Sequence, residues 1–175
     1  MIIYRAKRKA RAFFLTFLHG LNITSCGINL KLFGARHMKF GRSIRVGDNC
    51  WIEAISTYKN KSYSPTLNIG NSVAMSDSVH ISCVSMINIC SDVLIGSRVY
   101  IGDHSHGSTS DVTIDIPPGQ RELLDISPIH IGENTWICDG VVILAGTHLH
   151  KGCIVAANSV VKIKTTRACL IAGAP

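Results

Sequence analysis

The chain has 175 residues, of which 46% are hydrophobic and only 17% are charged, so extended disorder is excluded. The formal net charge is +7, but the basic residues along the body of the chain do not alternate with aromatic residues, which argues against a nucleic-acid-binding surface. There is no run of about 18 apolar residues, so the composition does not require a membrane-spanning helix.

The cysteine pattern favours free thiols. Seven cysteines are present, an odd number, and none forms a Cys-x-x-Cys pair. This spacing disfavours a disulfide framework and offers no zinc-ligand pattern. We therefore expect reduced, packed thiols in a cytoplasmic protein.

Residues 1–20 are predicted to form a basic amphipathic helix that ends at Gly20. A signal peptide is one interpretation, but the apolar segment is short. A second is a helix lying on an anionic membrane surface, at the inner face of the cytoplasmic membrane. A third is a helix that packs on the end of the following domain with its basic side in water. The residues behind these interpretations are Arg5, Lys7, Arg8, Lys9 and Arg11, followed by Phe13, Phe14, Leu15, Phe17 and Leu18.

A six-residue repeat runs from about residue 40 to Val161, after transitional residues 21–40, and it is strongest near the C-terminal end. Aliphatic residues stand at every sixth position: Ile131, Ile137, Ile143, Leu149, Val155 and Val161. The same spacing runs from Ile69 to Ile87 and, after a slip of two residues, from Ile89 to Ile101. Neither the helical period of 3.6 nor the strand period of 2 gives this pattern.

A period of six predicts a solenoid in which each coil has three short strands joined by turns. The expected fold class is all-β, a parallel β-helix of residues 21–164 preceded by the N-terminal helix. Residues 165–175 are expected to form a tail that leaves the repeat.

Two polar segments interrupt the repeat, and we expect both to be ejected from the solenoid. The first is Thr57–Thr66. The second covers about 103–128 and begins with the sequence Asp103-His104-Ser105-His106-Gly107. A regular solenoid has no need of a histidine-rich segment at a break, so the second interruption is the first place to look for chemistry.

Several of these motifs resemble those of the hexapeptide-repeat acyltransferases. They are Ile95-Gly96, Ile101-Gly102, the histidine-rich segment, the segment I-G-E-N-T-W-I at 131–137, A-N-S-V-V at 157–161 and I-A-G-A-P at 171–175. More narrowly, the chain resembles the bacterial sugar O-acetyltransferases of lipopolysaccharide, capsule and exopolysaccharide. The resemblance covers residues 40–175. It implies a left-handed β-helix, a homotrimer with active sites between subunits, acetyl-CoA as donor and a glycan or sugar as acceptor.

The resemblance also implies a general-base mechanism in which a histidine takes the proton from a sugar hydroxyl, which attacks the thioester directly. His104 matches the loop histidine of the family, and an imidazole is largely neutral at cellular pH. His106 is the alternative base or a supporting residue. Asp103 and Asp77 are candidates to orient the imidazole through its other nitrogen.

Further candidates concern the two substrates. Trp136 is expected to project into the groove and stack on the sugar, with a trimer contact as the alternative. Arg121, within the second interruption, is a candidate contact to an anionic acceptor. For acetyl-CoA, coil corners would meet the pantetheine arm and basic side chains would meet the phosphates. These candidates are Asp139, Ala157, Lys162, Lys164 and Arg167.

Two other functions stay open. Metal-dependent relatives of the same fold, the γ-type carbonic anhydrases, need three histidines that converge between subunits. His80, His104 and His106 are available, but their spacing does not match, so no metal is expected. The other alternative is a non-catalytic β-helix used as an assembly element. The chain departs from the family pattern at Cys138, which replaces the glycine usual after Trp-Ile.

Overall fold

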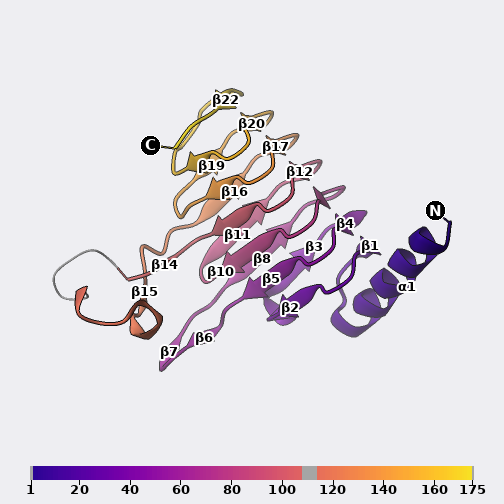
Figure 1. Ribbon diagram of the computed structural model, residues 1–175, viewed down its shortest axis with the longest axis horizontal. Coiled ribbons are helices and arrows are strands. Elements are labelled where there is room, and N and C mark those ends of the chain that lie inside the picture. Colours follow the sequence, from indigo (N-terminus) through magenta and orange to yellow (C-terminus); the bar gives the residue numbers. More distant parts are fainter. Residues whose placement is uncertain (1, 108–113, 175) are drawn as a thin grey trace.

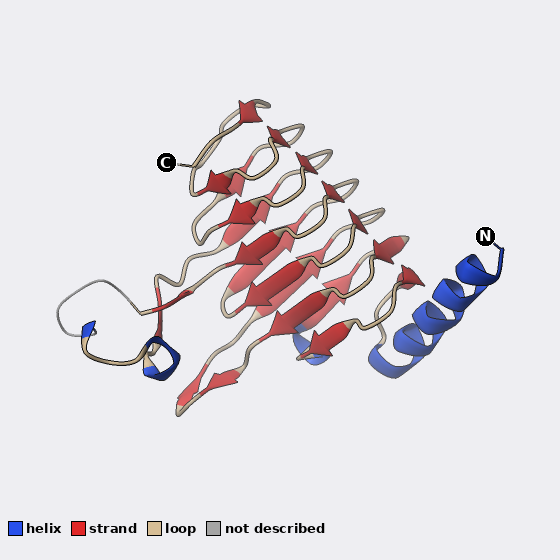
Figure 2. Ribbon diagram, viewed as in Figure 1, coloured by secondary structure: helices blue, strands red, loops and turns tan. Residues whose placement is uncertain are grey.

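The computed structural model describes residues 2–107 and 114–174. It shows a parallel β-helix with one long helix at its N-terminal end (Figure 1). A short hairpin and a longer loop project from the coils, on the side away from the helix (Figure 2). Residues 108–113 of the second interruption lie outside the described residues.

Three parallel sheets form the walls of the solenoid, and each coil adds one strand to each wall. Sheet A contains β1 (Ile23–Cys26), β4 (Ile44–Val46), β9 (Ala74–Met75), β12 (Leu94–Ile95), β17 (Trp136–Ile137), β20 (Ile154–Val155) and β22 (Leu170–Ile171). Sheet B contains β2 (Lys31–Phe33), β5 (Trp51–Ala54), β10 (His80–Cys83), β13 (Tyr100–Gly102), β18 (Val142–Ile143) and β21 (Val160–Val161). Sheet C contains β3 (Met38–Phe40), β8 (Thr66–Ile69), β11 (Met86–Ile89), β16 (Ile129–Ile131) and β19 (His148–Leu149).

The repeated aliphatic residues fill the interior. Ile95, Ile101 and Ile131 come from the three sheets in turn, and all are fully buried. Each stacks on its counterpart in the next coil, as Ile95 does on Ile137. Burying this continuous column supplies the main favourable term in folding. The expected fold class, an all-β parallel β-helix with an N-terminal helix, is confirmed.

The corners between sheets need two kinds of residue. Asn49 and Asn134 adopt the left-handed conformation that turns the chain, with φ of 56° and 55°. Gly96 serves close stacking instead, because a Cβ there would lie 2.5 Å from the Asp139 carboxylate and 2.6 Å from its backbone nitrogen. The coils can therefore approach each other at this corner only because position 96 has no side chain.

The interruptions of the repeat fall mainly at one corner, between sheets B and C. The slip of two residues places Val84 and Ser85 at this corner, between β10 and β11. The second interruption leaves the same corner one coil later. It contains β14 (Ser105–His106), a 3-10 turn η2 (Pro118–Gln120) and β15 (Leu123–Leu124), and β14 and β15 pair antiparallel. The first interruption forms the hairpin of β6 (Thr57–Tyr58) and β7 (Lys61–Ser62), and a second 3-10 turn, η1 (Ala35–His37), lies in the first coil.

Residues 165–175 were expected to leave the repeat, but part of this segment continues the solenoid. Leu170 and Ile171 form β22, which pairs in parallel with Ile154 and Val155 of β20. Lys164 also bridges to His148 of sheet C. Backbone pairing thus continues the solenoid beyond residue 164.

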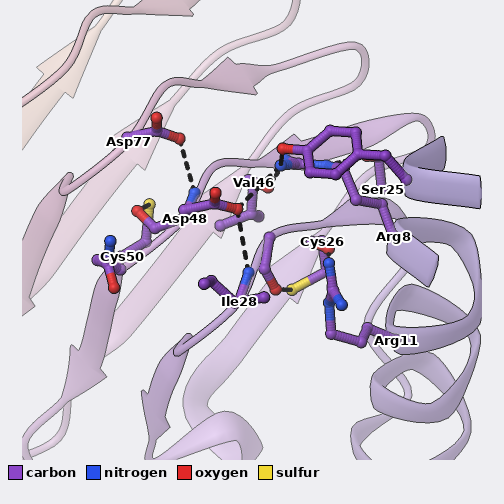
Figure 3. Close-up of polar contacts among 12 residues, drawn as sticks. Arg8, Arg11, Ser25, Cys26, Ile28, Val46, Asp48, Cys50 and Asp77 are labelled. Carbon is purple, nitrogen blue, oxygen red and sulfur yellow. Dashed lines mark hydrogen bonds and ion pairs between the residues drawn. The ribbon is translucent and has the colours of Figure 1, made fainter. Parts of the chain in front are cut away.

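Helix α1 (Ile2–His19) packs on the first coil, against β1. The expectation that its basic side faces water is wrong for two residues. Arg8 reaches the carboxylate of Asp48 at 3.0 Å, and Arg11 donates to the carbonyl oxygen of Cys26 at 3.1 Å (Figure 3). No helix among residues 2–107 and 114–174 is long and apolar enough to cross a membrane.

Candidate active site

A cavity of about 440 Å³ opens on the outer face of sheet B, next to the corner where the second interruption leaves the solenoid. The sheet supplies one wall, the β6–β7 hairpin a second, and β15 a third. The side chains that define it are Trp51, His80 and Tyr100 from sheet B, Tyr58 from the hairpin, Leu123 from β15, and His104 and His106 from the start of the interruption.

His104 is paired with a fully buried carboxylate. Its Nδ1 lies 3.1 Å from Oδ1 of Asp103, and only 8% of the residue is exposed. If Nδ1 donates its proton to Asp103, Nε2 carries the lone pair and can accept a proton from a bound molecule. This arrangement matches the base and orienting carboxylate of general-base catalysts.

Asp103 is itself fixed by the slip in the repeat. Its two carboxylate oxygens accept the backbone N–H groups of Val84 at 2.8 Å and Ser85 at 2.7 Å. The thiol of Cys83 lies 3.7 Å from the same carboxylate, and burial, together with Asp103, raises the pKa of this thiol to about 12. Two extra residues in the chain thus provide the donors that hold the buried carboxylate in place.

His106 lies where the two ejected segments meet. Its Nδ1 is 3.3 Å from the hydroxyl of Tyr58, and that hydroxyl donates to the carbonyl oxygen of Gly119 at 3.2 Å. Lys61 and Glu122 form an ion pair between the same segments at 3.4 Å. The hairpin and the second interruption therefore close over the cavity together.

Aromatic rings line the outer face of sheet B. Trp51 and His80 are in register on adjacent strands and stack with ring centroids 4.5 Å apart at 15°. His80 meets Tyr100 edge-on at 5.2 Å, and the ammonium group of Lys31 lies 4.9 Å from the Trp51 ring. An apolar shelf with polar edges is the kind of surface on which sugar rings stack.

Glu53 lies beside this shelf and accepts three hydrogen bonds. The donors are the Ser82 hydroxyl at 2.7 Å, the Trp51 indole N–H at 3.0 Å and the His80 ring at 3.4 Å. Burial by itself raises the pKa of Glu53, but the interactions with His80, Ser82 and Trp51 outweigh burial and hold its pKa below the ordinary value. The shelf therefore carries a carboxylate that can accept hydrogen bonds from hydroxyl groups.

Sequence reasoning missed this shelf. Trp51, His80 and Tyr100 each stand one position before an inward isoleucine, so the repeat itself marks them as outward residues of a strand. The repeat does not show that their strands, β5, β10 and β13, are neighbours in sheet B.

Two sequence candidates lie away from the cavity. Asp77 accepts the backbone N–H of Asp48 at 2.7 Å, at the corner between sheets A and B, so it does not contact His104 of the same chain (Figure 3). Arg121 donates to the carbonyl oxygens of Ile116 at 2.7 Å and Ile114 at 3.3 Å. Its guanidinium holds the second interruption together.

Comparison with known proteins identifies the repeat. Residues 128–162 match the family model described as bacterial transferase hexapeptide (six repeats). Residues 128–162 thus match a transferase hexapeptide repeat. The matched residues include β18, which pairs with β13, the strand that directly precedes His104.

Two curated relatives resemble this chain in sequence. One is the putative lipopolysaccharide biosynthesis O-acetyl transferase WbbJ of Escherichia coli K12, 39% identical over 109 residues, which cover 60% of this chain and 55% of WbbJ. The other is a probable acetyltransferase of Mycobacterium tuberculosis, 28% identical over 138 residues, which cover 79% of this chain and 42% of that protein. The chain spans about half the length of the curated relatives it matches.

A solved structure shares the fold. It is a mutant of AntD, an N-acyltransferase from Bacillus cereus, in complex with dTDP and coenzyme A. The TM-score is 0.67 at 15% sequence identity, over 93% of this chain and 84% of AntD. The solenoid is a left-handed parallel β-helix, as the resemblance implied.

Trp136 lies on a different face from the cavity. It is exposed on sheet A, in register between Leu94 and Ile154, whereas His104 is at the corner of sheets B and C. Within one chain the two side chains do not meet.

The candidates for coenzyme A fall into two groups. Lys162 and Lys164 line a second cavity of about 430 Å³ at the corner of sheets B and C, next to Gly146 and the end of the second interruption. The others lie at different corners: Asp139, which accepts the N–H of Ser97 at 2.6 Å, exposed Ala157, and exposed Arg167. The structure therefore brings only the two lysines to the corner that carries His104.

The histidines of the first cavity are each held by other partners. His80 stacks on Trp51, His104 pairs with Asp103, and His106 contacts Tyr58. In the part of the chain that the structure describes, no three histidine, cysteine, aspartate or glutamate side chains are arranged to hold a metal ion. All seven cysteines are free thiols.

Proposed function

We propose that the protein is an acetyl-CoA-dependent O-acetyltransferase that acts on a sugar hydroxyl of a bacterial surface polysaccharide or its precursor. The observation that carries the proposal is the buried pair of Asp103 and His104 at the edge of a cavity with an aromatic wall. The hexapeptide repeat and the likeness to WbbJ support the reaction class.

The reaction would proceed in a single displacement. Nε2 of His104 takes the proton of the acceptor hydroxyl as the oxygen attacks the thioester carbonyl carbon. The new C–O bond forms, the C–S bond breaks, and the proton on His104 passes to the departing thiolate. Asp103 keeps the imidazole oriented and stabilises its positive charge between the two proton transfers.

The two substrates would reach His104 from different directions. The acceptor sugar stacks on Trp51 and donates hydroxyl hydrogen bonds to Glu53. The donor lies along the corner of sheets B and C, with its phosphates at Lys162 and Lys164. Two coils separate those lysines from His104, roughly 10 Å of solenoid, so an elongated donor can span the distance.

A homotrimer is part of the proposal. Sheet A carries a column of exposed apolar side chains, and such a column is typically covered by a partner. Its members are Leu94, Trp136, Ile154 and Leu170. Trp136 would then act as an interface residue. We also propose a cytoplasmic location, which the seven free thiols support.

The proposal is tested by incubating the purified protein with acetyl-CoA and a panel of glycans and nucleotide sugars. We expect release of the CoA thiol together with one acetyl ester on the accepted glycan, detected by mass and by its loss under mild alkali. Acetylation only at nitrogen, or no thiol release with any acceptor, would contradict the proposal.

A substitution at the shelf separates acceptor binding from donor binding. Trp51→Ala is expected to raise the KM for the acceptor about tenfold, because the stacking surface is lost. Trp51→Phe keeps a ring and should stay close to the wild type. The KM for acetyl-CoA should be unchanged in both variants, since the donor is held at a different corner.

A further inference from the structure

Helix α1 turns its apolar side away from the protein. Apolar residues recur along one stripe at helical spacing: Ile2, Ile3, Ala6, Ala10, Phe13, Phe14 and Phe17. All of them are exposed, Phe13 to 76% and Phe17 to 81%. A helix that packs on a domain normally buries such a stripe.

The opposite side of α1 makes the contacts with the solenoid, and these include both arginine hydrogen bonds and apolar packing. Arg8 donates to the Ser25 hydroxyl at 3.1 Å, the Asp48 carboxylate at 3.0 Å and the Val46 carbonyl oxygen at 2.6 Å (Figure 3). On the same side, Ala12 is fully buried. Because the arginine contacts fix the rotation of the helix about its axis, the phenylalanines are held outward.

Cationic residues border the apolar stripe. Arg5 and Lys9 lie along one edge of it and Lys7 along the other, and all three are exposed. The helix contains no aspartate or glutamate. Its outer surface is thus an apolar stripe between positive edges, with no negative side chain of its own.

We propose that α1 docks the protein on an anionic lipid bilayer, with the helix lying in the plane of the interface. The phenylalanines and isoleucines would enter the boundary between headgroups and acyl chains, and Arg5, Lys7 and Lys9 would meet the lipid phosphates. We choose lipid phosphate as the partner because the edges of the stripe are positively charged and the helix has no acidic side chain. The proposal goes beyond the acetyl transfer proposed above and does not depend on it.

Vesicle sedimentation tests the docking directly. The protein is mixed with vesicles of phosphatidylcholine alone, or of phosphatidylcholine with about 30 mol% phosphatidylglycerol, without acetyl-CoA. We expect binding to the anionic vesicles to be at least about tenfold tighter, and to weaken as salt is raised. Equal binding to both vesicle types, or binding to neither, would overturn the proposal.

Paired substitutions identify the surface that binds. Phe13→Ser with Phe17→Ser, and separately Lys7→Gln with Lys9→Gln, should each lower the partition coefficient about tenfold or more. Met86→Ser removes an exposed apolar side chain from sheet C, and Lys151→Gln removes an exposed charge at a corner of sheets C and A. These controls should bind as the wild type does. Equal losses in the helix and control variants would contradict docking through α1.

Depth of insertion distinguishes a lipid surface from a second copy of the chain. A Phe17→Trp variant should gain a fluorescence component that brominated acyl chains quench, absent from the wild type with its own Trp51 and Trp136. If instead the Phe13→Ser, Phe17→Ser variant shows a smaller molecular mass in lipid-free solution, the stripe is a protein–protein contact and the proposal fails. Failure of any vesicle experiment leaves the acetyl-transfer assay unaffected, so the two proposals can fail separately.

Discussion

At the scale of single residues, Asp103 both stabilises a corner of the solenoid and orients the candidate base His104. It is fully buried, yet its carboxylate satisfies two backbone N–H groups and the ring of His104 at once. Leaving any of these groups without a partner would cost stability. The same bonds hold the imidazole in one orientation, so in the proposed mechanism Asp103 would act through His104.

Replacing Asp103 by asparagine should separate these effects. The amide has one acceptor oxygen in place of two, so one of the N–H groups of Val84 and Ser85 loses its partner. We expect kcat for acetyl transfer to fall roughly 100- to 10,000-fold, with a smaller change in the KM for acetyl-CoA. Steady-state kinetics on the folded variant checks this, and an unchanged kcat would show that Asp103 has no part in catalysis.

At the scale of elements, the two interruptions of the repeat build one site. The hairpin and the second interruption are joined through Tyr58 and Gly119, and through Lys61 and Glu122. The chain positions of these segments are far apart, but both leave the solenoid on the side of sheet B. Their meeting forms two walls of the cavity that His104 enters.

The sequence predicts part of this arrangement and not the rest. The inward residues repeat every six positions, so the coils, the core and the break at His104 can be recognised without a structure. The stacking of Trp51, His80 and Tyr100 cannot, because the inserted hairpin and the slip at Val84 change the number of residues per coil. Within one chain Trp136 and Asp77 lie apart from His104, and the sequence does not predict this, because spacing alone does not say which corner or face a residue occupies.

Close stacking at the corners gives a prediction for the coil as an element. Gly96→Ala places a Cβ against Asp139 of the next coil and should destabilise the protein by about 1–3 kcal/mol. Gly119→Ala is the matched control, since a Cβ there meets no atom within 4 Å. Chemical denaturation should show a lower midpoint for the first variant alone, and equal midpoints would argue against tight stacking at this corner.

At the scale of the whole molecule, the surfaces of the solenoid differ in character. Sheet B carries the cavity, sheet A carries the apolar column, and the N-terminal end carries α1. A trimer formed through sheet A would use a different wall of the solenoid from the one that carries the cavity. It would also explain why Trp136, Leu94 and Ile154 stand in one column without contacting the site.

The trimer can be tested by charging that column. Leu94→Lys puts an ammonium group in the middle of the proposed interface, where Leu94 is 46% exposed in the single chain. We expect the molecular mass measured by light scattering to fall from that of a trimer toward that of a monomer. Met86→Lys makes the same change at a side chain 44% exposed on sheet C and should leave the mass unchanged. A variant of Leu94 that keeps the trimer would place the interface elsewhere.

The assignment of the base among the two histidines of the cavity is the most direct test of the account. It requires kcat/KM for acetyl transfer by the wild type, His104→Gln and His106→Gln, each verified to keep the oligomeric state of the wild type. Because His104 alone pairs with the buried carboxylate, its loss should lower kcat/KM about 1000-fold, whereas loss of His106 should lower it less than about tenfold. The reverse order, or full activity in His104→Gln, would contradict the account.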